Sequence, residues 1–142
     1  MRSSYTQLYV HCVWSTWNRL PLLTPDIREI VYGAIAKECQ TLKCTPIAIG
    51  GIDDHVHLLA GYLPTISVSA LMKQVKGSSS HLMNYQIRPD QFFKWQSSYS
   101  AFSVSQSGLD VVAAYIRNQE QHHTARSLQK CWELPDKAMS LM

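Results

Sequence analysis

The sequence predicts an α+β fold, in which helices pack on one antiparallel sheet. Two observations predict it: four short segments have the apolar patterns of strands, and three longer segments repeat apolar residues with the period of a helix. The chain has 142 residues, of which 46% are hydrophobic and 16% are charged. This composition is typical of a globular chain and excludes an intrinsically disordered one. We expect one domain over residues 1–142, ending in a weakly patterned tail, 126–142.

The first predicted elements are a strand and a helix. Residues 5–14 alternate between apolar and polar side chains, as a half-buried strand does. Thr24 supplies a helix N-cap and Pro25 suits the first helical position. Apolar residues then recur at helical spacing, which predicts a helix that ends near Lys43.

A hairpin and a second helix are predicted next. The β-like runs 46–52 and 55–62 flank a turn at 53–54, which is typical of a hairpin. In residues 67–83 apolar side chains recur at intervals of three and four, which indicates an amphipathic helix. Its centre, 77–80, consists of glycine and serine and is a poor helix former.

The last predicted elements complete the sheet and add a third helix. Residues 99–105 alternate again and predict the fourth strand. Ser107 and Asp110 resemble a capping box that opens a helix reaching about His123. The element order is therefore βαββαβα, which is typical of the ferredoxin-like plan of an antiparallel sheet with helices packed on it.

Charge, apolar runs and cysteines narrow the class of protein. Thirteen Lys and Arg against ten Asp and Glu give a net charge of +3, which is compatible with a polyanionic partner without proving one. No apolar run approaches the roughly 18 residues of a membrane-spanning helix, and no signal-peptide core follows Met1, so we expect a cytoplasmic chain without a membrane partner. The four cysteines are scattered, which favours buried thiols over disulfides or a structural zinc site.

The segment His55-Val56-His57 is a candidate metal site. In a strand, side chains two apart project from the same face, about 7 Å apart along the strand, so both imidazoles can bind one ion. The alternative is a pair of surface histidines on a solvated sheet face.

Tyr115 and Gln119 form a second candidate constellation. They lie one helical turn apart, so a phenol and a carboxamide can face one site. The helical wheel places both at the border of the buried face. The alternative is a tyrosine that packs at this border, with its ring buried and its hydroxyl in water.

Four motifs in order resemble one family, the single-tyrosine HUH transposases of the insertion sequence 200/605 group. They are Gly50-Gly51-Ile52-Asp53-Asp54-His55-Val56-His57-Leu58-Leu59, then Thr65-Ile66-Ser67-Val68-Ser69 with Lys73-Gln74-Val75-Lys76-Gly77-Ser78-Ser79, then Trp95-Gln96 with Tyr99-Ser100-Ala101-Phe102-Ser103-Val104-Ser105, and Tyr115-Ile116-Arg117-Asn118-Gln119-Glu120-Gln121-His122-His123. The resemblance runs from about residue 5 to 123. Ser100, where glycine is expected, and the tail after Arg126 depart from the pattern.

The resemblance implies an HUH endonuclease and DNA strand transferase, which cleaves and rejoins single-stranded DNA at transposon ends. Tyr115 would form a 5′-phosphotyrosine link and release a 3′-hydroxyl. His55, His57 and Gln119 would hold a divalent ion, Mg or Mn, against the scissile phosphate. Asp54 is expected to orient an imidazole, or else to cap its own turn.

The resemblance also implies hairpin-ended single-stranded DNA as partner and a homodimer, in which the tyrosine serves its own or the partner's histidines. Lys73, Lys76 and Arg117 are candidate phosphate contacts, the alternative for the lysines being a solvated helix face. His11, His81, His122 and His123 receive no catalytic role, the last two at most offsetting a helix dipole.

Two other functions compete with transposition. One is a domesticated or inactive HUH protein that binds hairpin DNA without cutting it. The other is a histidine-based nucleotide hydrolase, which is disfavoured because the third alternating position holds Leu59 instead of histidine.

Overall fold

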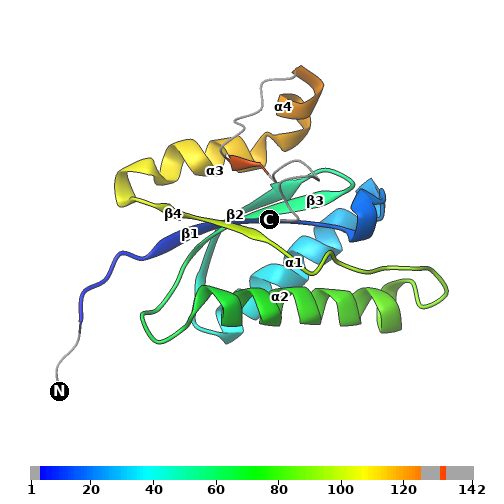
Figure 1. Ribbon diagram of the computed structural model, residues 1–142, viewed down its shortest axis with the longest axis horizontal. Helices are drawn as coiled ribbons and strands as arrows, with labels where there is room; N and C mark the ends of the chain where they lie inside the picture. Colours follow the sequence, from blue (N-terminus) through cyan, green and yellow to red (C-terminus); the bar gives the residue numbers. More distant parts are fainter. Residues whose placement is uncertain (1–3, 126–131, 134–142) are drawn as a thin grey trace.

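The computed structural model describes residues 4–125, 132 and 133, and has helices on both faces of a sheet (Figure 1). The sheet has four antiparallel strands in the order β2-β3-β1-β4, so the predicted α+β class is confirmed. The strands are β1 (Tyr9–Ser15), β2 (Thr45–Gly51), β3 (His55–Gly61) and β4 (Ser100–Val104). The helices are α1 (Pro25–Thr41), α2 (Val68–Leu82), α3 (Leu109–Arg117) and α4 (Gln119–Ala125), with short turns of helix η1 (Trp17–Arg19), η2 (Met83–Ile87) and η3 (Gln106–Gly108).

The two faces of the sheet carry different layers. Helices α1 and α2 cover one face, and α3 and α4 lie on the other (Figure 1). Side chains alternate along β3, so Val56 and Leu58 enter the larger core with α1 and α2, whereas Leu59 packs against Ile116 of α3. The odd-numbered residues of β3 therefore face α3 and α4.

Hydrogen bonds explain the serine-rich centre of α2. The Oγ atom of Ser79 donates to the carbonyl oxygen of Val75 at 2.7 Å and accepts from Nε1 of Trp95 at 2.9 Å. The carboxylate of Glu38 in α1 accepts from Ser78 at 2.8 Å and from Gln74 at 2.7 Å. The helix continues through poor helix formers because these residues bind neighbouring segments.

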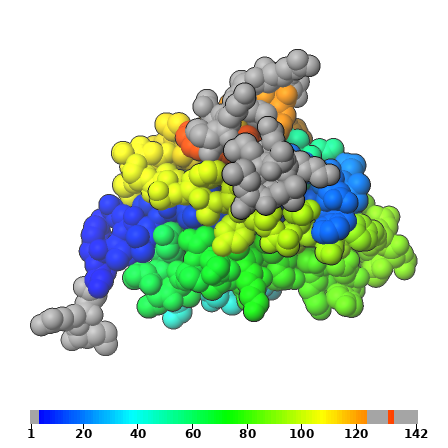
Figure 2. Space-filling model, in the orientation of Figure 1, coloured from blue at the N-terminus to red at the C-terminus, as the bar shows by residue number. Residues whose placement is uncertain are grey.

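The start of β1 and the form of the last predicted helix differ from the sequence prediction. Residues 4–7 are exposed or half-buried at the end of the molecule that is dark blue in Figure 2, and the strand begins at Tyr9. The predicted capping box is wrong, because Gly108 is the N-cap of α3 and Ser107 contacts the hydroxyl of Ser105 at 3.1 Å. The predicted single helix is divided at Asn118, whose φ of −107° and ψ of 28° leave the helical region.

A glycine allows α3 to approach the sheet closely. A Cβ atom on Gly50 of β2 would lie 2.1 Å from the carbonyl oxygen of Ile116 in α3. Since no side chain fits there, Gly50 sets the distance between β2 and the part of α3 that carries Tyr115.

Buried thiols account for the described cysteines. Cys12, Cys39 and Cys44 are free and buried, as predicted, and Cys131 lies outside the described residues. Burial raises the pKa of Cys12 and of Cys39 to about 12. Over residues 4–125 and 132–133, no helix combines the length and apolarity needed to cross a bilayer.

Candidate active site

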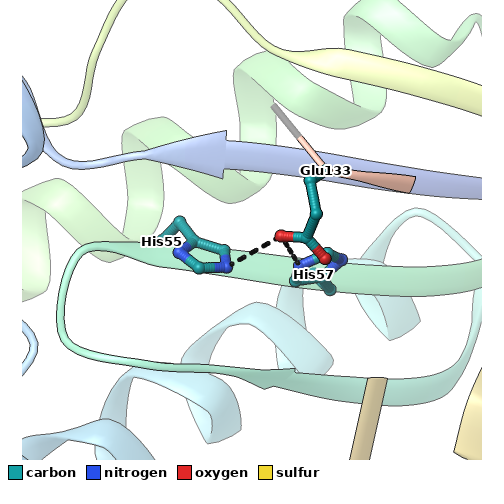
Figure 3. Close-up of side chains that lie close together, drawn as sticks. All are labelled: His55, His57 and Glu133. Carbon is teal, nitrogen blue, oxygen red and sulfur yellow. Dashed lines mark hydrogen bonds and ion pairs between the residues drawn. The ribbon is translucent and has the colours of Figure 1, made fainter. Parts of the chain in front are cut away.

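His55 and His57 project from β3 toward a common point (Figure 3). Their side chains are buried, with residue exposures of 1% and 0%, so the alternative of two surface histidines is wrong. The Nε2 atoms of His55 and His57 lie 3.4 Å and 3.3 Å from the same oxygen, Oε1 of Glu133. The pair therefore converges as the strand period predicts.

Each of these imidazoles has a partner at its other nitrogen. Oδ1 of Asp54 lies 2.8 Å from Nδ1 of His55. Nε2 of His11, on the neighbouring strand β1, lies 2.8 Å from Nδ1 of His57, and the two rings stack with centroids 5.1 Å apart. Both rings are thereby held with Nε2 facing the shared point.

Tyr115 brings its phenol from α3 into the same place. Its hydroxyl donates a hydrogen bond to Oε2 of Glu133, and its ring centroid is 5.9 Å from that of His57. Tyr115 is 4% exposed, so it lies deeper than the border position that the helical wheel predicts. Trp132 contacts the phenol ring edge-on at 5.2 Å. The phenol is buried because Trp132 and Glu133 lie over it.

Gln119, the first residue of α4, reaches the site from the other side of the helix break. Its Oε1 lies 3.2 Å from Nε2 of His55 and 3.1 Å from Nε2 of His123, and its Nε2 donates to the carbonyl oxygen of Tyr115 at 3.4 Å. At 1% exposure it is also more buried than predicted. The structure thus brings Tyr115, Gln119 and both strand histidines together within one chain.

Three residues that the sequence analysis left without a role lie in this cluster. Glu133 contacts both strand histidines and the phenol, and His11 contacts His57. His123 contacts Gln119, and its ring centroid lies 4.9 Å from that of His55, with the two rings tilted. His11 occupies a polar position in a strand of alternating polarity, and such positions are too common to assign it to the site. No spacing rule connects a glutamate in an unpatterned tail with a strand far away in sequence.

The electrostatics of the site depend on two carboxylates. Burial opposes protonation of His55, but hydrogen bonds to Asp54 and Glu133 outweigh it and raise its pKa to about 9. Burial alone would raise the pKa of Glu133, yet hydrogen bonds from His55 and His57 hold it well below its ordinary value. Burial lowers the pKa of His57. The site therefore keeps an anionic carboxylate beside the two imidazoles.

This donor set fits a divalent cation. Among the described residues, His55, His57 and Glu133 form a group whose candidate ligand atoms all lie within 4.8 Å of one another. Neutral imidazole suits Zn, Fe, Ni and Cu, and carboxylate suits Mg and Mn. The residues therefore offer a buried site with mixed nitrogen and oxygen ligands.

The three candidate phosphate contacts lie in different places. Lys73 and Lys76 belong to α2, on the face of the sheet opposite the histidines, and the structure does not bring them to the site. Nζ of Lys76 donates to the carbonyl oxygens of Gln96 at 2.6 Å and Ser98 at 3.3 Å. Arg117 lies two residues after Tyr115 and donates to the carbonyl oxygen of Ile47 at 3.0 Å.

Comparison with known families accounts for this combination of residues. The family model described as "Transposase IS200 like" matches residues 4–119, which include the histidine pair, Tyr115 and Gln119. The chain belongs to the IS200-like transposase family. A comparison with the curated proteins finds no match for this IS200-like transposase.

Two solved structures have a similar fold. A protein from Deinococcus radiodurans assigned as a transposase is 24% identical over 84% of this IS200-like transposase and 95% of its own chain, with a TM-score of 0.67. A REP-associated tyrosine transposase bound to a REP hairpin is 15% identical over 82% of this chain and 68% of its own, with a TM-score of 0.60.

Proposed function

We propose that this IS200-like transposase cleaves and rejoins single-stranded DNA at the ends of a mobile element, with Tyr115 as the nucleophile. One observation carries the proposal: the hydroxyl of Tyr115 and the Nε2 atoms of His55 and His57 all contact a single carboxylate, that of Glu133. A phenol oxygen and two candidate cation ligands thus share one buried site. Family membership supports the assignment.

The covalent step exchanges one phosphodiester for another. The phenol oxygen of Tyr115 forms a bond to phosphorus, and the bond between phosphorus and the 3′ oxygen breaks. The net proton moves from the phenol to the 3′ oxygen, which leaves as a free hydroxyl. Because the tyrosyl ester retains the energy of the broken bond, a second 3′-hydroxyl can attack it and rejoin DNA without ATP.

A divalent cation, Mg or Mn, would be held by His55, His57 and Gln119. When bound, it would neutralise charge that develops on the phosphate and polarise the oxygens that enter and leave. The chain's own contribution is orientation. Asp54 binds Nδ1 of His55 at 2.8 Å, so it keeps Nε2 of that ring directed at the site.

The DNA partner that we propose is a single strand with a hairpin end. The structurally similar REP-associated transposase is bound to a REP hairpin. Arg117 belongs to α3, the helix that carries Tyr115, and is therefore the best placed of the three proposed phosphate contacts. Lys73 and Lys76 would contact DNA only where it passes the α2 face. We also propose a homodimer as the working assembly.

A covalent-adduct assay tests the nucleophile. Labelled single-stranded oligonucleotides that cover both DNA flanks of the gene are incubated with protein and Mg²⁺ or Mn²⁺, and adducts are resolved on a denaturing gel. We expect an adduct with the unchanged protein and none with Tyr115→Phe, while both bind the DNA. Tyr85→Phe is the matched control, because Tyr85 lies in η2 and is 72% exposed.

Two results would contradict the proposal. An undiminished adduct with Tyr115→Phe would refute the nucleophile assignment. Tight hairpin binding with no adduct in either cation, by the unchanged protein, would instead support a binding protein that does not cut.

A further inference from the structure

Glu133 is the residue that joins the parts of this site. Its Oε1 lies 3.3 Å from Nε2 of His57, 3.4 Å from Nε2 of His55 and 3.9 Å from Nε2 of His123. Its Oε2 accepts the hydrogen bond of the Tyr115 hydroxyl. The side chain is only 13% exposed, so its charge is withdrawn from water and directed at these four groups. Figure 3 shows the carboxylate facing both strand histidines.

The two available oxygen ligands differ in strength and in position. Gln119 offers a neutral carboxamide oxygen, which lies between His55 and His123. Glu133 offers an anionic oxygen near the Nε2 atoms of both strand histidines. Hard divalent cations such as Mg²⁺ and Mn²⁺ favour anionic oxygen, and a cation among two imidazoles and a carboxylate is bound more tightly than one held by neutral ligands alone.

We propose that Glu133 is a ligand of the divalent cation, and that its second carboxylate oxygen holds the Tyr115 phenol toward that cation. The inference rests on the proposed function and adds to it a ligand contributed by the C-terminal tail. The cation is then held by groups from β3 and from the tail, with the carboxamide of Gln119 beside them. The nucleophile is connected to the cation through one carboxylate.

Cation binding without DNA tests the ligand separately from the cleavage reaction. Mn²⁺ is titrated into the full-length protein, and free Mn²⁺ is measured by its electron paramagnetic resonance signal. We expect Glu133→Ala to weaken Mn²⁺ binding by at least about tenfold, as loss of metal-site groups commonly does. Asp110→Asn is the control, because it removes an exposed carboxylate from α3 outside the site. Its affinity should equal that of the unchanged protein.

Glu133→Gln separates the two tasks of the carboxylate. The carboxamide keeps an oxygen that can accept the Tyr115 hydrogen bond but loses the negative charge. We therefore expect weak Mn²⁺ binding, together with adduct formation that recovers at saturating Mn²⁺. Glu133→Ala should not recover to the same extent, because the phenol then loses its hydrogen-bond acceptor as well.

The outcomes are distinguishable from failure of the proposed function. Unchanged Mn²⁺ affinity in Glu133→Ala, with weaker affinity in His57→Ala, would overturn the ligand role and leave Tyr115 chemistry intact. Unchanged Mn²⁺ affinity together with increased adduct formation in Glu133→Ala would also overturn the ligand role, since the carboxylate would then act by excluding DNA from the site. Absence of Mn²⁺ binding by the unchanged protein would overturn it too. The proposed function itself fails if the unchanged protein forms no adduct, whatever the Mn²⁺ affinities of the variants.

Discussion

Nε2 of His11 lies 2.8 Å from Nδ1 of His57, so a buried histidine on β1 fixes the ring of a candidate cation ligand on β3. Burial, reinforced by the nearby His57, lowers the pKa of His11 to about 3, which keeps this partner neutral. We predict that His11→Phe, which retains a ring but removes the hydrogen bond, lowers the free energy of unfolding by about 1–3 kcal/mol. It should also weaken Mn²⁺ binding by about 10–100-fold. Urea denaturation and Mn²⁺ titration measure the two effects, and no change in either would show that the contact orients nothing.

Gly50 should be intolerant of even one added methyl group. The Cβ atom of alanine would lie 2.1 Å from the carbonyl oxygen of Ile116, so α3 must move and carry Tyr115 away from His57. We predict that Gly50→Ala lowers both thermal stability and adduct formation. Gly33→Ala in α1 is the matched control, because its added Cβ has no atom within 4 Å apart from the adjoining backbone of its own helix. That control should gain about 0.5–1 kcal/mol, and equal behaviour of the two variants would contradict the close approach.

Tyr115 should act on the site of its own chain. Its ring lies 5.9 Å from that of His57 in the same chain, and both contact the same Glu133. We predict that mixing Tyr115→Phe with His57→Ala does not restore adduct formation, because neither chain has a complete site. Recovery of up to about a quarter of the activity, as random subunit mixing would allow, would show that the tyrosine crosses between subunits.

The hydrogen bonds that join α1 to α2 should make stability depend on pH. Those from Gln74 and Ser78 hold the pKa of Glu38 below its ordinary value of 4.5. A carboxyl group whose pKa is lowered in the folded state stabilises the protein at pH values above its ordinary pKa. This stabilisation is lost as the pH falls through the pKa of the folded state. Glu38→Gln should therefore be less stable than the unchanged protein at pH 7, and the difference should shrink below about pH 4. Urea midpoints across pH measure it, with Glu29→Gln, an exposed carboxylate in α1, as control; a difference constant with pH would contradict the argument.

The order of strands and helices could be predicted because it depends on local periodicity. The convergence of His55 and His57 follows from the two-residue period of a strand, and the proximity of Tyr115 and Gln119 follows from the helical turn. That proximity survives the break at Asn118, since Gln119 still donates to the carbonyl oxygen of Tyr115.

The partners of these residues could not be predicted. His11 and Glu133 are separated from His57 by 46 and 76 positions, and no periodic pattern operates over such distances. The burial of Tyr115 exceeds the prediction for a similar reason. A helical wheel shows which residues of α3 face the sheet, but it does not show Trp132, which packs on the phenol ring from outside the helix.

Side chains alternate between the two faces of the sheet along β3, so adjacent positions in this strand have different tasks. Val56 and Leu58 serve the apolar core under α1 and α2, whereas His55 and His57 serve the opposite face. Substitutions at adjacent positions should therefore fail in different ways, by loss of folding or by loss of turnover. An engineer who wishes to change the cation or the DNA specificity can alter one side of this strand and leave the scaffold that supports it unaltered.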